Sequence, residues 1–481
     1  MLTSALILLP LVAAVLVWVL PLKAAWTSGL AFLVSLAGVG LWIGSARGFD
    51  FAAATPQYAT DRVWFEDLGI SYAVGLYGFQ YWLVGLTLVV GAAAIGYGGL
   101  VERERPRAYF GLMLFLVGSL VGMFSSQDLL LFYVFFEAML IPLYVLVGVW
   151  GGPARVKATV TFVIYTMAGS LLMLASIVAF GISQGTFSLA EAGTSDNDLV
   201  FLGFLVAFAV KAPLFPFHGW LRTAYTEAPP EVAAVLSGAV SKAVVFGLVW
   251  IVLPHFPEPV EEWRTVVLVL ASVTLAYGSV LAFRQPDARG VVAYSSMGQM
   301  GLIVLGIFAF TDLGLDGAVL HSVSHGLVSA ALFLLAGMIE QRTGTGRLHD
   351  LGGLARGRPL LATLVMMAGM FTLAVPGSTN FAGEFAILAG VFGHGWGYAA
   401  VGAAAIVLAA MYSLRLISAV LHERRGSAVG DDVTDLGEVE LYLVVPLVAA
   451  LVALSFWPAG ITERSFPNDE PTATLTREAT G

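Results

Sequence analysis

The sequence is divided into a long series of apolar runs, each about as long as a membrane-crossing helix requires. A helix needs about 20 predominantly apolar residues to cross roughly 30 Å of hydrocarbon. The runs lie near residues 2–20, 25–44, 79–100, 108–125, 129–149, 158–182, 199–220, 230–253, 265–283, 290–310, 314–339, 359–391, 397–421 and 437–458. They predict an all-α polytopic membrane protein with about fourteen transmembrane helices.

Composition agrees with this class and excludes others. Charged residues make up 11% of the chain, whereas soluble proteins carry about 25%. The net charge of −9 argues against a nucleic-acid partner. Because the chain has no cysteine, it can form no disulfide, no thiolate zinc site and no cysteine-ligated iron–sulfur cluster.

The positive charges in the connections indicate how the chain is oriented. Fifteen of the twenty Lys and Arg residues between the predicted spans fall on one side and five on the other. Cytoplasmic loops carry the excess of Lys and Arg. We therefore expect a multi-pass protein of a prokaryotic plasma membrane, with both termini outside. The first apolar run has no basic segment before it, so we interpret it as a retained helix.

Five ionisable residues fall well inside predicted spans: Glu137, Lys211, Lys242, His325 and Glu384. Such groups are costly in hydrocarbon and typically mark ion or proton pathways. The alternative is a structural role, in which paired charges hold neighbouring helices together. Loss of water favours a neutral lysine, and a nearby carboxylate favours the charged form. A carboxylate that approaches and leaves Lys211 would make it hold and release a proton, and we expect Glu137 in that role.

Two of the predicted spans contain helix breaks. Pro213 and Pro216 follow Lys211 closely, and "VPGSTN" at 375–380 precedes Glu384. Non-helical backbone at membrane depth is tolerated where it is buried in protein or lines a watered cavity. Paired breaks in two halves are typical of inverted repeats. We therefore predict two inverted five-helix repeats, spans 4–8 and spans 9–13, each with a broken fourth helix.

Two further side chains leave alternatives open. His321 and His325 are four residues apart, a spacing that also suits zinc, but no third ligand is evident. We therefore interpret His321 as a packed or hydrogen-bonded histidine. Arg415 falls within or at the end of the thirteenth span, and the sequence leaves its role open.

Five segments of the sequence resemble the antiporter-like subunits of respiratory complex I. They are "FYVFFEAMLIPLYVLVGVWGG", "KAPLFPFHGWL", "AYSSMGQMG", "SHGLVSAALFLLAG" and "PGSTNFAGEF". The resemblance implies fourteen helices with two inverted five-helix repeats. It also implies a proton relay in which the family's key residues fall on Glu137, Lys211, Lys242, His325 and Glu384.

The sequence departs from the usual family pattern at two positions. Gln299 stands where the family often has a histidine, and a glutamine cannot carry charge. Tyr77 stands where an aspartate often precedes the third helix. Since Gln299 cannot serve as a charged carrier, we expect His325 and water to bridge the gap to Glu384. We expect Tyr77 to affect only local packing.

The predicted organisation has four parts: 1–106 with three helices, 107–253 and 264–422 as the two repeats, and 423–481 with the last helix and a polar tail. The resemblance implies a subunit of NADH:quinone oxidoreductase that translocates protons and holds no redox cofactor itself. It places NADH, FMN, iron–sulfur clusters and quinone in partner subunits. Neighbouring antiporter-like subunits of the L and N types, and lipids, are the expected partners.

Three alternatives remain open at this point. The chain could belong to a multisubunit cation/proton antiporter, which is a transporter and not part of a redox enzyme. The same pump could be coupled to another electron donor, such as a reduced deazaflavin, ferredoxin or a hydrogenase module. The third alternative is a purely structural scaffold.

Overall fold

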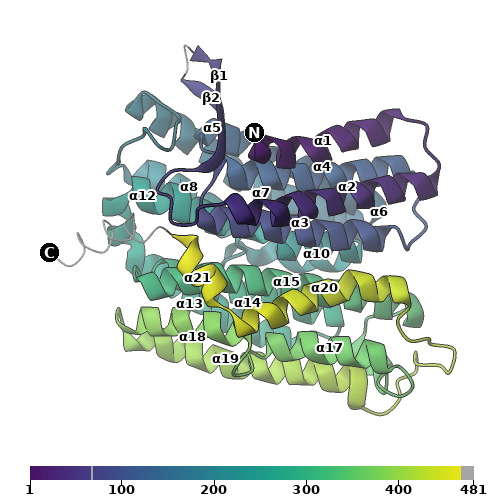
Figure 1. Cartoon of the computed structure of the whole chain (residues 1–481). Helices are drawn as coiled ribbons and strands as arrows, with labels where there is room; N and C mark the ends of the chain where they lie inside the picture. Colours follow the sequence, from purple (N-terminus) through teal and green to yellow (C-terminus); the bar gives the residue numbers. More distant parts are fainter. Residues whose placement is uncertain (67–68, 467–481) are drawn as a thin grey trace.

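The computed structural model describes residues 1–66 and 69–466, and these form a bundle of helices that run side by side (Figure 1). The first half contains α1 Leu2–Val19, α2 Ala24–Ser45, α3 Gly78–Gly98, α4 Pro106–Ser125, α5 Leu129–Ala138, α6 Leu140–Trp150, α7 Arg155–Gln184, α8 Asp198–Lys211, α9 Leu221–Glu227, α10 Pro230–Gly238, α11 Ala243–Gly247 and α12 Leu253–His255. The second half contains α13 Pro257–Arg284, α14 Ala288–Ile307, α15 Asp312–Thr343, α16 Leu348–Leu351, α17 Pro359–Thr372, α18 Thr379–Phe392, α19 Trp396–Ile417, α20 Glu438–Phe456 and α21 Ala459–Ser465.

The helices confirm the predicted all-α membrane class. Within the described residues, 12 helices are long and apolar enough to cross a membrane. The shorter apolar helices α17 and α18 occupy the predicted span 359–391. The predicted span 199–220 holds α8 and a 3₁₀ turn, Phe217–Trp220, and α9 follows it. Both of these spans are interrupted where prolines predicted a break. The total of fourteen spans and the inverted repeats stay predictions.

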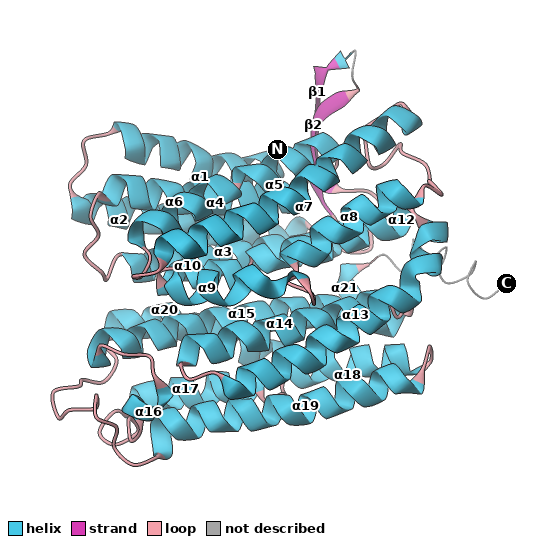
Figure 2. Cartoon of the chain, turned by 180° about the vertical axis from the view of Figure 1, so that it is seen from behind, coloured by secondary structure: helices cyan, strands magenta, loops and turns pink. Residues whose placement is uncertain are grey.

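A β-hairpin between α2 and α3 was not predicted. Strand β1, Gln57–Phe65, pairs antiparallel with β2, Ile70–Leu76, and the hairpin projects from the bundle (Figure 2). Aromatic and β-branched residues such as Val63, Trp64 and Tyr72 favour strands. The two strands are too polar and too short to resemble a membrane span, so apolar runs in the sequence do not predict the hairpin.

Residues from both ends of the described chain lie at the same end of the bundle. The Thr3 hydroxyl donates to the carbonyl of Tyr58, 3.0 Å away, in strand β1 of the hairpin. At the other end of the chain, the ring of Phe466 stacks on Phe79 with 5.7 Å between ring centroids. Because Phe79 follows the hairpin directly, residues 3 and 466 lie at the same end of the bundle.

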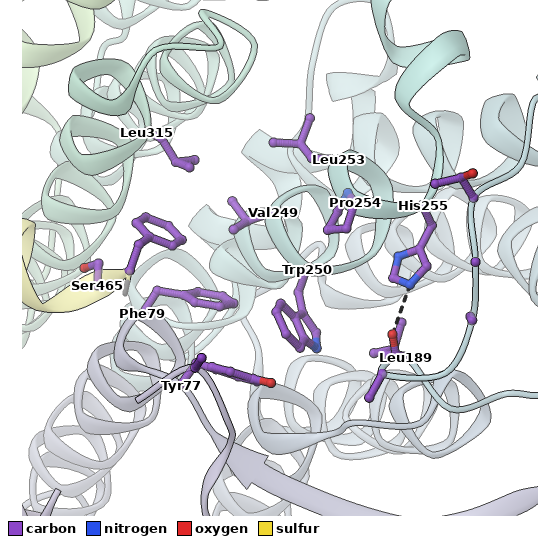
Figure 3. A pocket seen from close by; sticks show the side chains of 16 residues that line it. Tyr77, Phe79, Leu189, Val249, Trp250, Leu253, Pro254, His255, Leu315 and Ser465 are labelled. Carbon is purple, nitrogen blue, oxygen red and sulfur yellow. Dashed lines mark hydrogen bonds between the residues drawn. The ribbon is translucent and has the colours of Figure 1, made fainter. Parts of the chain in front are cut away.

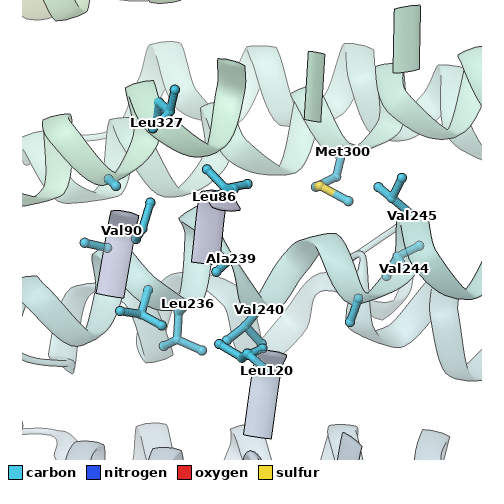
Figure 4. Close-up of a cluster of buried hydrophobic side chains, with 14 of the residues drawn as sticks. Leu86, Val90, Leu120, Leu236, Ala239, Val240, Val244, Val245, Met300 and Leu327 are labelled. Atoms are coloured by element: carbon cyan, nitrogen blue, oxygen red, sulfur yellow. The ribbon is translucent and has the colours of Figure 1, made fainter. Parts of the chain in front are cut away.

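The core is centred on α15 and the helical segment that begins with α10, which are wholly buried through their most apolar windows. Buried side chains of α3, α10 and α15, among them Leu86, Leu236 and Leu327, pack against one another in this core (Figure 4). A Cβ atom added to Gly326 would lie 2.6 Å from the carbonyl oxygen of Gly238. These two glycines therefore let the backbones of α10 and α15 approach closely, since any side chain would collide.

Candidate functional site

Lys211 is the last residue of α8, directly before the predicted break. The helix cannot continue through Pro213 and Pro216, since proline supplies no backbone donor, and helical structure resumes only at Phe217. The break frees the carbonyl of Val210, which accepts a hydrogen bond from the indole of Trp220 at 3.0 Å. The Lys211 ammonium is buried without a hydrogen-bond partner in the described part of the chain.

Glu137 lies on α5 near Lys211 but forms no ion pair with it in this structure. The neighbouring Phe136 ring faces the ammonium, with Nζ 4.9 Å from the ring centroid, an arrangement that stabilises a cation. Glu137 is half-buried, and its Oε1 has no partner among the described residues. The structure therefore brings the two predicted residues to one region and holds them in a separated state.

Lys242 lies at a helix irregularity that the sequence analysis missed. α10 ends at Gly238, and a 3₁₀ turn, Val240–Lys242, follows it. The turn leaves the carbonyl of Ser237 available, and Lys242 Nζ donates to it at 2.8 Å. The same ammonium contacts Ser241 Oγ at 3.1 Å and His325 Nδ1 at 2.9 Å. Lys242 and His325 are thus directly hydrogen-bonded to each other.

Glu384 lies on α18, after the second predicted break. α17 ends at Thr372 and α18 begins at Thr379, where the Ser378 hydroxyl accepts the Phe381 N–H at 3.2 Å. Glu384 is 1% exposed. Its Oε1 accepts a hydrogen bond from Gln299 Nε2 at 3.1 Å.

Gln299 and His321 lie together in the gap before Glu384. Gln299 Oε1 lies 2.8 Å from His321 Nε2, so Gln299 joins His321 to Glu384 directly. The expected role of His325 and water as the proton-carrying groups in this gap stays a prediction. The interpretation of His321 as a hydrogen-bonded histidine is confirmed. The sequence could not show the bridge, because its three residues come from three different helices.

The structure also contains a buried acid that the sequence analysis did not single out. Glu231, in the first turn of α10, is 0% exposed. Its Oε1 accepts short hydrogen bonds from the Arg103 guanidinium and the Tyr109 hydroxyl. The ion pair ties the loop between α3 and α4 to the helix that leads to Lys242. A glutamate two residues after Pro229 has the appearance of an ordinary exposed first-turn acid, which explains the omission.

The two remaining sequence questions have local answers. Arg415 donates to the carbonyls of Phe283 and Gln285, at 2.6 and 3.0 Å, and so caps the end of α13. Tyr77 packs against Trp250, with 4.5 Å between ring centroids. Both aromatic residues line a cavity of about 370 Å³ that also borders His255 (Figure 3). The predicted packing role of Tyr77 agrees with this position.

Comparison with known proteins identifies the family. The model of the family "NADH:quinone oxidoreductase/Mrp antiporter, TM" matches residues 126–411, more than half of the chain. The chain belongs to this family. The matched region contains the two breaks and all five predicted relay residues.

Individual members of the family match almost the whole chain. NADH-quinone oxidoreductase subunit M of Mycobacterium tuberculosis is 33% identical over 98% of this chain and 94% of its own length. F(420)H(2) dehydrogenase subunit M of Methanosarcina mazei is 32% identical over 98% of both chains. A chain of respiratory complex I from Thermus thermophilus has a TM-score of 0.89 and 30% identity, and 99% of each chain is covered.

Proposed function

We propose that this chain is a proton-translocating membrane-arm subunit of a complex I-type NADH:quinone oxidoreductase. The observation that carries the proposal is the direct bond between Lys242 and His325 inside the most deeply buried helices. Burying a lysine in hydrocarbon surroundings costs free energy, which a purely structural contact does not explain. A lysine that donates to a histidine is suited to passing a proton, because histidine readily gains and loses one. Similarity to subunits M over nearly the full chain supports the same function.

In the proposed relay, protons move through the chain's own side chains. Glu137 controls whether Lys211 holds or releases its proton, and the break after Lys211 gives the lysine room to exchange it. Lys242 passes a proton to Nδ1 of His325 along the existing 2.9 Å hydrogen bond. Glu384 is the distal group, which accepts a proton and later releases it.

The redox chemistry belongs to partner subunits in this proposal. The chain has no cysteine for an iron–sulfur cluster, and within the described residues no three His, Asp or Glu side chains gather into a metal site. Electrons from NADH would pass through FMN and iron–sulfur clusters to quinone in other subunits. The chain would contact neighbouring subunits of the L and N types and lipids.

We further propose a prokaryotic plasma-membrane location with both termini outside. The side-to-side bias of Lys and Arg supports the orientation, and residues 3 and 466 lie at the same end of the bundle. Residues 107–253 and 264–422 would be the two inverted repeats, since each contains one broken helix with a relay residue at the break. Residues 1–106 and 423–481 would flank them.

Two other functions have specific support. The family includes subunits of Mrp antiporters, and the Methanosarcina relative belongs to an F(420)H(2) dehydrogenase. Neighbouring genes distinguish the three functions. Flavin and iron–sulfur subunits would indicate a redox enzyme, and their type would indicate the electron donor. Small antiporter subunits would indicate a transporter.

Substitutions of Glu384 test the pumping role. Glu384→Asp keeps a titratable group at shorter reach and should retain part of the pumping. Glu384→Gln keeps the size and the hydrogen bond to Gln299 but cannot titrate, so it should lose most of the pumping. Proton uptake would be measured in vesicles that contain the purified complex. Pumping by Glu384→Gln at the wild-type rate would remove Glu384 from the pathway.

A further inference from the structure

His321 lies in the gap between His325 and Glu384, two proposed members of the relay that are not directly hydrogen-bonded to each other. It is on α15, one helical turn before His325, and their ring centroids are 6.1 Å apart. Through Gln299 it is also joined to Glu384. The charged or titratable groups around it are Lys242, His325 and Glu384. His321 is therefore connected to both sides of the gap.

The hydrogen bonds determine which nitrogen of His321 carries the proton. The Gln299 NH₂ group donates to Glu384, since a carboxylate only accepts. The carbonyl end of the amide therefore faces His321, and Nε2 of the imidazole must be the donor. In neutral His321 this leaves Nδ1 as a bare acceptor. Nδ1 is buried and has no partner among the described residues.

Glu384 has the matching feature on the other side of the amide. Its Oε1 is bonded to Gln299, while its Oε2 is buried without a partner in the described part of the chain. Buried polar atoms without hydrogen bonds are rare and call for an explanation. The hydrogen bonds to Gln299 hold both side chains in place. Nδ1 of His321 and Oε2 of Glu384 have no such bond and are available for proton exchange.

We propose that His321 is a proton-carrying residue between His325 and Glu384, and that Gln299 is its positioning residue. The proposal rests on the proton-pumping function proposed above. A proton from His325 binds at Nδ1 through an intervening water, which makes His321 an imidazolium. The N–H bond at Nδ1 then breaks as an O–H bond forms at Oε2. His321 returns to its neutral Nε2–H form, and Glu384 becomes the neutral acid. Gln299 keeps its amide form throughout.

A competing route would bypass His321. His325, Gln299 and Asn380 line a small cavity with about 10 Å³ available to a water-sized sphere, enough for about one water. Oδ1 of Asn380 is buried without a partner among the described residues. A water there could connect His325 toward α18 directly. The proposal favours His321 because only that residue has a continuous series of hydrogen bonds to Glu384.

The test is a set of variants in the intact complex, assayed for proton pumping and quinone reduction in vesicles. His321→Gln keeps a donor for Gln299 but cannot hold the proton, so pumping should fall at least tenfold. Adding Gln299→His should restore a third or more of it, because a histidine there lies beside Glu384. A merely structural role for His321 would not give this rescue. His255→Gln replaces another buried histidine, outside the relay, and serves as the matched control.

Two results would overturn the proposal. The first is pumping by His321→Gln within twofold of wild type, which would assign the transfer to the cavity beside Asn380. If His321→Gln does not assemble, Gln299→Leu is the deciding variant, because it keeps His321 and removes the hydrogen bonds of Gln299 to His321 and Glu384. Unchanged pumping by Gln299→Leu is the second result that would overturn the proposal. Glu384→Gln, assayed in the same preparation, distinguishes failure of the proposed pumping relay from failure of the role of His321 alone. If it also pumps normally, Glu384 is not in the pathway and the proposed relay fails; if it alone is defective, only the role of His321 fails.

Discussion

Replacing Lys242 with arginine tests whether this residue must release its proton in every cycle. Three acceptors surround its ammonium: the Ser237 carbonyl, Ser241 Oγ and His325 Nδ1. Arginine keeps the positive charge and can donate to the same acceptors, but it stays protonated in proteins. Lys242→Arg therefore separates the holding of a charge from the release of a proton.

The expected magnitude follows from the ordinary acidities of the two side chains. The usual pKa of lysine is about 10.4, and that of arginine is well above it. The difference lowers the population of the neutral side chain by about 10²–10³. Because all three acceptors surround either cation alike, they do not offset this difference. We expect proton pumping by Lys242→Arg to fall by roughly two orders of magnitude or to the background.

The assay compares pumping and quinone reduction in vesicles that contain the assembled complex. Lys157→Arg makes the same substitution at an exposed position in the first turn of α7 and should leave both rates unchanged. Lys242→Met removes all three donors, and each buried acceptor left unsatisfied costs about 1–3 kcal/mol, so its unfolding temperature should fall as well. Pumping by Lys242→Arg within twofold of wild type would refute the release step.

Three further predictions concern other parts of the chain. Lys211→Ala or Glu137→Ala should leave the complex assembled but reduce quinone reduction and pumping together, because a blocked relay stalls the cycle that drives it; normal pumping in vesicles would contradict the switch, and loss of assembly would favour a structural role. A cysteine placed in the 340–358 loop of this cysteine-free chain should resist an impermeant thiol reagent applied to intact cells, and labelling from outside would reverse the orientation. Burial raises the pKa of the Asp128 carboxyl, at the start of α5, from 3.8 to about 6. The folded chain therefore favours the protonated form, so this contribution to stability is present below about pH 4 and is lost as pH rises through about 6. Asp128→Asn should flatten that pH dependence of the thermal unfolding temperature, and an unchanged slope would exclude Asp128 as its source.

The sequence was sufficient to predict features that depend on local composition. Apolar runs of the right length located the helices, and Pro213 and Pro376 marked the two interrupted spans. The buried positions of Lys211 and Lys242 also followed, because a lysine within an apolar run has no route to water along its own helix. Each of these inferences needs only residues within one segment.

Features that depend on contacts between helices could not be predicted in this way. The bridge from His321 through Gln299 to Glu384 joins α15, α14 and α18, and nothing within any one helix specifies it. The same holds for Glu231, whose partner Arg103 is 128 residues away. The 3₁₀ turn before Lys242 has no proline to mark it. Its stability comes from the hydrogen bonds of its side chains.

The contact between Gly238 and Gly326 limits where the moving part of such a pump can be. At this contact no side chain separates the two backbones, so α10 and α15 have no compressible layer there that would let one slide or tilt against the other. In the proposed relay, the 2.9 Å hydrogen bond from Lys242 to His325 would therefore be a fixed junction, which a proton could cross in either direction. A hydrogen bond of fixed length lets a proton pass but does not make it pass in one direction only. In the proposed relay, direction would then come from Glu137 and Lys211, which form no ion pair in this structure.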